Sequence, residues 1–524
     1  MKKGTDLRPT RMSCCPSSPG GNRRSGSGMT RRNFLEGVGG GALLASALPK
    51  LTRAARLSGE TNEGPLLGRR PITVKPVLSY SLPKRKFQTS WRNWGGIQTQ
   101  PDADLEIERI RSEWARLRRA ADFPLEVLPL SRVERASDLA SIADLTKADV
   151  FLVYAAGGWM DVLDEIARPA KPMIVFCRHK SGPVYLWYEI VSPRYLRQHT
   201  DRLTVNGVDE EDVVIDSLDE LLWRLRSLCG LANTLGSRIL AVGGPSAWAQ
   251  PEGVVPKLAE EKWKFDIQTV SYDELGRLVG EARAERATVE SARRAAEAYL
   301  KSPGVVLETQ LAFVENAFLL ETIFRRLMRE ADCRAMTING CMGTIMPIAE
   351  TSACLTLSLL NDAGYMVFCE SDFVVIPSGV LLANISGKPV FLNDPTYPHD
   401  GIITLAHCTA PRKMDGKKLE PARIRTHFES DYGAAPKVQM RKGQVVTNIA
   451  PDFAAKRWVG LASEIIDAPD MDICRSQIDV RFGCDSRILA ERMPGFHWMT
   501  AYGNYAREIG YAIKRVGIEW DLLG

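Results

Sequence analysis

The sequence predicts an α/β fold in which parallel sheets covered by helices are followed by a C-terminal β-rich domain. Two patterns predict this class. Through most of the chain, short apolar runs alternate with helical patterns, which is typical of parallel sheets. After about residue 420 the pattern changes to short strands and turns, which is typical of a barrel-like domain. With 524 residues, 45% of them hydrophobic and 25% charged, the chain has the composition of a globular protein with several domains.

The first α/β domain is expected over residues 71–205. Between residues 104 and 121, apolar side chains recur at intervals of three and four, which predicts a helix with one buried face. Because helical patterns also separate the apolar runs, we expect a Rossmann-like parallel sheet. Its strands are expected at 72–78, 125–130, 150–154 and 173–177.

A second α/β domain is expected over residues 206–335. It begins with a strand at 212–215, after which Ser217 and Glu220 form the capping-box pattern that starts a helix. Its other elements are expected to be a strand at 238–243 and long helices at 284–301 and 311–331.

The last domain, residues 336–524, is expected to combine an α/β segment with the β-rich domain. In the α/β segment, strands are expected at 335–339, 365–369 and 390–393, and helices at 352–360 and 379–385. In the β-rich part, strands are expected at 423–427, 438–440, 445–449 and 478–481, before a final helix at 505–516.

Residues 1–47 have the pattern of a targeting peptide. Arg31 and Arg32 precede an uncharged, weakly apolar stretch that ends in a small-x-small cleavage pattern. This arrangement resembles a twin-arginine signal, which implies that the twin-arginine translocase exports the folded protein to the periplasm or another extracytoplasmic space. A linker is expected over residues 48–70, and Met29 is an alternative start of translation.

Charge and hydropathy exclude two kinds of partner. Residues 1–47 contain eight basic and two acidic residues, so their +6 exceeds the total of +5 and leaves −1 for the rest of the chain. This balance does not support binding to nucleic acid. No later segment reaches the roughly 18 uncharged apolar residues of a membrane helix, so we expect no membrane span in the mature protein.

The cysteines follow no metal or disulfide motif. Nine of the eleven lie after Cys14 and Cys15 of the leader, at irregular spacing and without a C-x-x-C pair. This pattern argues against a disulfide framework, a zinc ribbon and an iron–sulfur cluster. We therefore expect mostly thiols, with Cys354 and Cys369 buried beside the candidate site.

Acidic residues follow three successive predicted strands of the last α/β segment. Glu350 follows the strand at 335–339. Asp372 follows the next strand, with Glu370 two residues before it, and Asp394 comes one unit later. Because the carboxyl ends of parallel strands share one edge of a sheet, where ligands bind in open α/β folds, we expect these carboxylates to meet there.

Five motifs in this part of the chain resemble the L-fucose isomerase family, to which L-arabinose isomerase is related. The similarity covers roughly residues 310–520, whereas residues 70–300 match only as generic α/β. In order, the motifs are residues 359–364 with 369–372, 387–394 with 405–408, 442–447, 474–477 and 494–497.

The resemblance implies an aldose–ketose isomerase for a pentose or a 6-deoxyhexose that works through an ene-diol. It implies a divalent cation, usually Mn²⁺, held by Glu350, Asp372 and His497, with Glu350 and Asp372 also carrying the proton. A cation is needed because negative charge develops on two sugar oxygens, and hard oxygen ligands with one imidazole suit Mn²⁺. The family also implies a homo-oligomer, either a trimer or a hexamer.

Other residues remain candidates for these roles. Glu370 could replace either acid, and His399 or His407 could replace the imidazole. Contacts with the sugar are expected from His179, Trp94 and His407.

A function of a different class is also open: an exported sugar-binding protein that keeps the isomerase fold without catalysis. Export favours this alternative, because sugar isomerases usually act on cytoplasmic sugars, whereas a metal triad favours the enzyme. A nicotinamide-dependent oxidoreductase has no support, because Gly243 and Gly244 lack the spacing of a phosphate-binding loop and predict only a turn.

Overall fold

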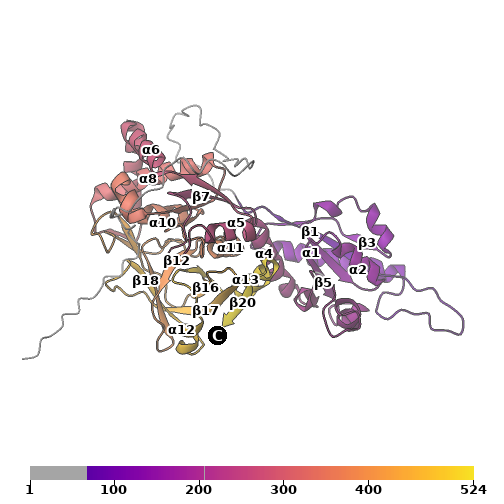
Figure 1. Ribbon diagram of the computed structural model, residues 1–524. Helices are drawn as coiled ribbons and strands as arrows, with labels where there is room; N and C mark the ends of the chain where they lie inside the picture. The colour runs from indigo at the N-terminus through magenta and orange to yellow at the C-terminus, as the bar shows by residue number, and fades with distance from the viewer. Residues whose placement is uncertain (1–67, 206, 249) are drawn as a thin grey trace, which may run out of the picture.

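The structure, a computed structural model, describes residues 68–205, 207–248 and 250–524. They form a smaller unit around one parallel sheet and a larger unit in which a second parallel sheet lies against a β-barrel (Figure 1). This arrangement confirms the expectation of an α/β protein with a C-terminal barrel-like domain. The expected leader, with Arg31 and Arg32, lies outside the described residues.

The smaller unit is built on a six-stranded parallel sheet. Its strands are β1 (Ile72–Ser79), β2 (Leu125–Val127), β3 (Ser131–Val133), β4 (Val150–Ala155), β5 (Met173–Cys177) and β6 (Val213–Ile215). The order is β2-β1-β4-β5-β6, and β3 also pairs with β1. Strand β6 belongs to this sheet because it pairs with β5, whereas we expected it to open a separate domain at residue 206.

Helices cover both faces of this first sheet. Because side chains alternate along a strand, Leu152 and Tyr154 of β4 pack on α1 (Gln100–Ala120), whereas Phe151 and Val153 pack on α2 (Met160–Ala167). Both faces are therefore apolar, as the continuous hydrophobic run of β4 predicts.

A buried ion-pair network ties α1 to the end of β5. Arg178, directly after β5, pairs with Glu106 at 2.6 Å and with Glu113 at 2.8 Å, and at most 5% of each side chain is exposed. The hydroxyl of Tyr185 also donates to Glu106 at 2.6 Å. Because buried charges need partners, this network holds α1 in one position on the sheet.

The larger unit contains a four-stranded parallel sheet in the order β11-β10-β7-β8. Its strands are β7 (Arg238–Val242), β8 (Asp266–Val270), β10 (Ala335–Ile338) and β11 (Met366–Phe368). Since β10 pairs with β7, the domain boundary that we expected at residue 335 falls inside one sheet. The helices of the larger unit are α5 (Val255–Trp263), α6 (Tyr272–Ala284), α7 (Arg286–Leu300), α8 (Leu311–Glu330), α9 (Met346–Ala349), α10 (Cys354–Asp362) and α11 (Ile376–Ser386). Helix α4 (Leu218–Thr234) contributes Leu221 and Leu225 to the core of the smaller unit.

The barrel is a closed ring of six antiparallel strands. They are β12 (Phe391–Pro395), β13 (Ile402–His407), β16 (Val445–Pro451), β17 (Arg457–Asp467), β18 (Ser476–Arg481) and β19 (Trp498–Tyr502). The order is β16-β19-β12-β13-β18-β17, and β17 pairs back to β16. Around the barrel lie β20 (Glu519–Leu523), the helices α12 (Ser486–Arg492) and α13 (Ala506–Ile513), and a small sheet of β9 (Val305–Leu307), β14 (Ala422–Arg425) and β15 (Ala435–Val438).

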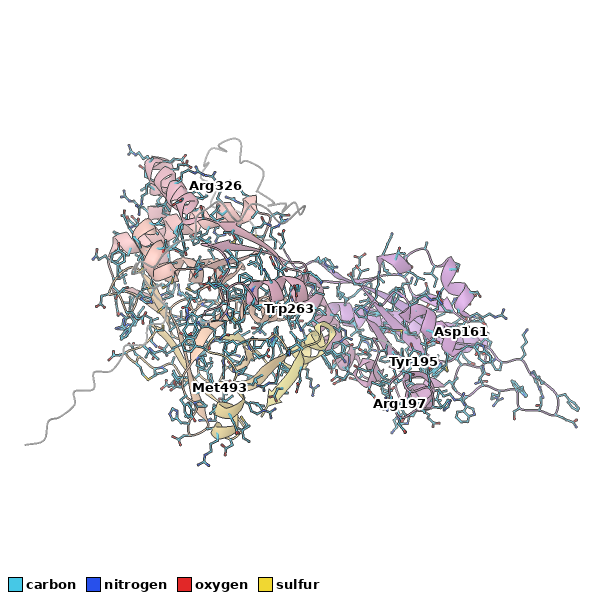
Figure 2. All side chains as sticks on the ribbon, in the orientation of Figure 1. Asp161, Tyr195, Arg197, Trp263, Arg326 and Met493 are labelled. Carbon is cyan, nitrogen blue, oxygen red and sulfur yellow. The ribbon has the colours of Figure 1, made fainter. Side chains whose placement is uncertain are left out.

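Tight packing joins these parts. Helix α4, which lies between the two units in Figure 1, approaches α11 so closely that a Cβ on Gly230 would lie 2.2 Å from Ile385. In the larger unit, the buried Trp263 of α5 (Figure 2) stacks on Trp458 of β17, with ring centroids 5.5 Å apart. The helix layer of the second sheet and the barrel therefore share one core.

Among the described residues, no single helix is long and apolar enough to cross a membrane. One bent pair, 341–349 with 354–362, passes the same test of length and composition at an angle of 86°.

Candidate metal centre

Five ionisable side chains converge where the carboxyl edge of the second sheet meets one end of the barrel. Between 1% and 13% of each side chain is exposed. The five are Glu370, Asp372, Asp394, His407 and His497. His497 lies at the centre: its Nδ1 is 2.7 Å from Oδ2 of Asp372. Its Nε2 is 3.2 Å from Oε2 of Glu370 and 3.3 Å from Oδ1 of Asp394.

The turn after β11 brings Glu370 and Asp372 into the cluster. Glu370 and Ser371 adopt φ values of 68° and 48°, in the left-handed region that is unfavourable for residues with a Cβ. The amide of Ser371 donates to Oγ1 of Thr337 at 3.0 Å, and its carbonyl accepts from the amide of Ser246 at 3.0 Å. Neighbouring parts of the sheet thus hold a strained turn, as is common at functional sites.

The barrel supplies the other three members through its strand register. In the antiparallel pairing of β12 with β19, Asn393 lies opposite Trp498, and the same register places Asp394 opposite His497. On the other side of β12, strand β13 ends at His407, whose Nε2 lies 3.6 Å from Glu370.

Burial and charge together set the protonation of the cluster. Burial opposes a charged imidazole, but the negative charge of Glu370 and the hydrogen bond to Asp372 raise the pKa of His497 well above its usual value. Burial raises the pKa of Asp394 to about 6. Burial acts on Glu370 in the same direction, but the charge of His497 and the contact with His407 lower the pKa of Glu370 to about 2. The carboxylates of the cluster therefore stabilise a positively charged group that lies between them.

A divalent cation fits this donor set. Nε2 of His497 and Oδ1 of Asp394 are buried and make no hydrogen bond to any described residue. Ligand atoms about 2.2 Å from an octahedral ion lie about 3.1 Å apart, close to the 3.2 and 3.3 Å from His497 to Glu370 and Asp394. Asp372 accepts from the other ring nitrogen, as outer carboxylates do beside metal-binding imidazoles. Glu370, Asp394 and His497 would therefore hold the ion, and Asp372, which we expected to be a ligand and a proton carrier, would instead orient His497.

Glu350, which we expected to be a metal ligand and a proton carrier, does not join this cluster. Its Oε1 lies 2.6 Å from Nη1 of Arg283 on α6, and 59% of its side chain is exposed. The reason is local structure: residues 341–349 form short helical turns after β10, and Glu350 follows them with φ of 53°. These turns carry Glu350 away from the sheet edge, whereas Glu370 lies beside His497.

The residues that we expected to contact a sugar are divided between the two units. His407 belongs to the cluster, and its Nδ1 lies 3.0 Å from Oγ1 of Thr409. His179 follows β5 in the smaller unit and stacks on Tyr188, and Trp94 of the same unit is 68% exposed. Within one chain, the structure therefore does not bring His179 or Trp94 to the cluster. His399, the other candidate imidazole, is exposed and contacts the carbonyl of Tyr397.

Sequence reasoning missed an aromatic pair beside the cluster. Trp248 and Phe496 stack with ring centroids 4.5 Å apart, and they lie 5.5 and 5.2 Å from the ring of His497. Phe496 is 37% exposed, so this pair forms an apolar wall between His497 and the surface. Phe496 precedes His497 in the sequence, but nothing in the sequence places Trp248 near it.

The cysteines agree in part with expectation. None of the nine in the described part of the chain forms a disulfide. Cys369 is buried beside the cluster, because its Sγ and donor atoms of Glu370 and His407 all lie within 4.8 Å of one another. Cys354 is also buried, but it belongs to a second group of side chains.

Comparisons with protein-family models and with curated proteins give no significant match for this chain.

Proposed function

We propose that the chain is a metal-dependent aldose–ketose isomerase that acts on a pentose or a 6-deoxyhexose. The observation that carries this proposal is the buried cluster of Glu370, Asp394 and His497, with Asp372 behind His497. All four residues fall in motifs that resemble the L-fucose isomerase family. We also propose that the parallel sheets are Rossmann-like and that the chain forms a homo-oligomer. We further propose that the twin-arginine translocase exports it.

The chemistry requires a proton to move between C2 and C1 while both oxygens carry partial negative charge. When bound, a divalent cation such as Mn²⁺ would supply the positive charge that stabilises those oxygens. Glu370, Asp394 and His497 would hold it, and Asp372 would keep Nδ1 of His497 protonated so that Nε2 stays available.

Glu370 and His407 are the proposed proton carriers. Oε2 of Glu370 faces His497, whereas its Oε1 lies 3.6 Å from Nε2 of His407. In this proposal Glu370 takes the proton from C2 and returns it to C1, and His407 exchanges a proton with the sugar oxygens. Trp248 and Phe496 offer an apolar surface for one face of the sugar, as aromatic side chains do in many ligand sites.

A sugar-binding protein without catalysis is the second candidate, and one observation favours it. Glu350, which the family resemblance implies as a ligand, is exposed and paired with Arg283. The two candidates differ in turnover, because a binding protein needs neither a cation at the cluster nor a proton carrier.

The test is an assay for ketose formation over a panel of pentoses and 6-deoxyhexoses with Mn²⁺-loaded protein. We expect turnover by the wild type, unchanged turnover by Glu350→Gln, and a loss of at least about 100-fold in kcat for Glu370→Gln, because a ligand and a proton carrier are lost together. Sugar-dependent thermal stabilisation without turnover in any sugar would support the binding protein instead.

A further inference from the structure

A second group of metal-binding side chains lies outside the candidate metal centre. Sγ of Cys354, Sγ of Cys408 and a ring nitrogen of His427 all lie within 4.8 Å of one another. Cys474 contacts Cys408 and packs in the same small buried cluster. All four residues are buried, with exposed fractions between 2% and 6%.

Four separate segments bring these residues together. Cys354 begins α10, and Cys408 directly follows β13. His427 lies two residues after β14, and Cys474 lies two residues before β18. Because each ligand comes from a different segment, their spacing in the sequence matches no zinc motif, which is why the sequence argued against such a site.

We propose that Cys354, Cys408, Cys474 and His427 bind one zinc ion in a closed, structural site. This site is distinct from the proposed catalytic centre and does not depend on the proposed function. Three thiolates and one imidazole are a common ligand set of structural zinc, which is tetrahedral and leaves no open position. Soft thiolates also disfavour Mn²⁺ and Mg²⁺, so the two sites would select different metals.

The distances suit such an ion. With zinc–sulfur bonds of about 2.3 Å, tetrahedral geometry separates two sulfur atoms by about 3.8 Å. The 4.8 Å limit covers Cys354, Cys408 and His427, and small rotations about χ1 would close these three around zinc. Cys474 reaches the same point through its contact with Cys408. Nδ1 of His427 lies 3.5 Å from the hydroxyl of Ser430, which leaves Nε2 for the metal and gives the ring an outer partner.

The surroundings favour the thiolate form that zinc needs. The backbone amide of Arg475 donates to Sγ of Cys408 at 3.4 Å. Hydrogen bonds from backbone amides stabilise negative charge on sulfur.

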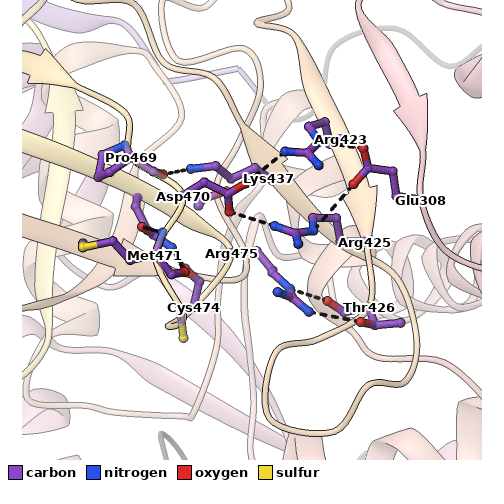
Figure 3. Close-up of polar contacts among 12 residues, drawn as sticks. Glu308, Arg423, Arg425, Thr426, Lys437, Pro469, Asp470, Met471, Cys474 and Arg475 are labelled. Carbon is purple, nitrogen blue, oxygen red and sulfur yellow. Dashed lines mark hydrogen bonds and ion pairs between the residues drawn. The ribbon is translucent and has the colours of Figure 1, made fainter.

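Arg475 joins the segments that carry two of the ligands. Its Nε donates to the carbonyl of Thr426 at 2.7 Å and its Nη2 to the hydroxyl of Thr426 at 3.1 Å, next to His427 (Figure 3). Its guanidinium also lies over the ring of Phe428. Arg475 therefore holds the His427 segment beside Cys474 and supplies positive charge near a centre whose net charge, with three thiolates and Zn²⁺, would be −1.

The test uses the full chain, purified under reducing conditions, stripped of metal and reloaded with Co²⁺ as a spectroscopic substitute for zinc. We expect sulfur-to-cobalt charge-transfer absorption in the near ultraviolet that corresponds to about one thiolate-bound cobalt per chain and that zinc abolishes. This spectrum of the wild type requires no variant to fold. Cobalt-loaded protein without that absorption, or a Cys354–Cys408 disulfide found by mass mapping under reducing purification, would overturn the proposal.

Variants separate this site from the catalytic one. Cys474→Ser should weaken zinc binding at least about 100-fold and shift the cobalt spectrum, whereas the matched control Cys484→Ser, at a cysteine outside the group, should change neither. Asp394→Asn should keep the cobalt–thiolate absorption. If Asp394→Asn abolishes this absorption while Cys474→Ser retains it, the zinc assignment fails and the proposed catalytic centre is untouched.

Discussion

Nδ1 of His497 lies 2.7 Å from Oδ2 of Asp372, although 125 residues separate them in the sequence. This contact connects the strained turn after β11 to the strand register of the barrel. It fixes the imidazole with Nε2 facing Glu370 and Asp394. The contact thus makes the orientation of one ring depend on two separate parts of the fold.

Replacing Asp372 by Asn tests this orienting role. The amide keeps the shape of the side chain but removes the negative charge that raises the basicity of His497. We expect the dissociation constant for Mn²⁺ to rise about 10- to 100-fold, as for other outer carboxylates. Isothermal titration of metal-free protein measures the change, with Glu350→Gln as the control. An unchanged constant, or a loss as large as that of Asp394→Asn, would contradict the orienting role.

The sequence predicted the elements best where the periodicity is strong and the environment is simple. The continuous apolar run of β4 and the apolar stripe of α8 each fall within a few residues of the expected bounds. Strand β17 was missed because Gly460, Ala462 and Ser463 interrupt its pattern. In the structure Gly460 is required, since a Cβ there would lie 2.1 Å from the ring of Trp520. Packing against distant residues such as Trp520 determines that this segment forms a strand, and the local sequence pattern does not reveal such contacts.

The site was partly predictable for a similar reason. Asp372 follows β11, so the rule that ligands lie at the carboxyl edge of a parallel sheet located it. Asp394 was expected by the same rule, but the strand expected at 390–393 is β12 of the barrel, and Asp394 lies inside it and joins the cluster through the antiparallel register. The same rule misplaced Glu350, because the residues after β10 fold into helical turns that change where Glu350 lies. Trp248 and the four residues of the proposed zinc site depend on contacts between distant segments, which one sequence does not reveal.

The network around Arg178 should be a major contributor to the stability of the smaller unit. Arg178→Met leaves Glu113 buried without its cation and leaves Glu106 paired only with the half-exposed Arg109. Breaking a buried pair in this way costs about 3 to 5 kcal/mol, so we expect a corresponding fall in the free energy of unfolding of that unit. Arg111→Met is the matched control, because Arg111 and Glu108 form an exposed pair on the same helix. Urea unfolding followed by circular dichroism gives both values, and equal effects would refute the prediction.

Asp362 should make stability depend on pH. Burial raises the pKa of Asp362 from 3.8 to about 7, so the folded state keeps a proton that the unfolded state releases. The stabilising contribution is therefore complete below about pH 4 and is lost as the pH rises to about 7.

Asp362→Asn should remove this loss, because the amide is never charged and its oxygen can still accept from the amide of Lys413. We expect the variant to exceed the wild type at pH 8 by up to a few kcal/mol in free energy of unfolding, and to differ little at pH 4. Asp201→Asn, at an exposed carboxylate, should not change the profile. A constant difference between Asp362→Asn and the wild type across this range would exclude the effect.

The export prediction concerns Arg31 and Arg32. Replacing both by Lys keeps the charge but removes the two guanidinium groups that a twin-arginine receptor would recognise. We expect precursor to accumulate in the cytoplasm, detected by fractionation and blotting. Normal export of the Lys–Lys variant would rule out the twin-arginine assignment.

We propose that Glu370, Asp394 and His497 together hold one divalent cation. Electron paramagnetic resonance of free Mn²⁺ during titration of metal-free protein measures it directly, because bound Mn²⁺ loses the sharp signal of the hydrated ion. We expect one high-affinity site in the wild type and in Glu350→Gln, and its loss in Glu370→Gln and Asp394→Asn. High-affinity binding that survives both Glu370→Gln and Asp394→Asn, or that disappears in Glu350→Gln, would contradict this proposal.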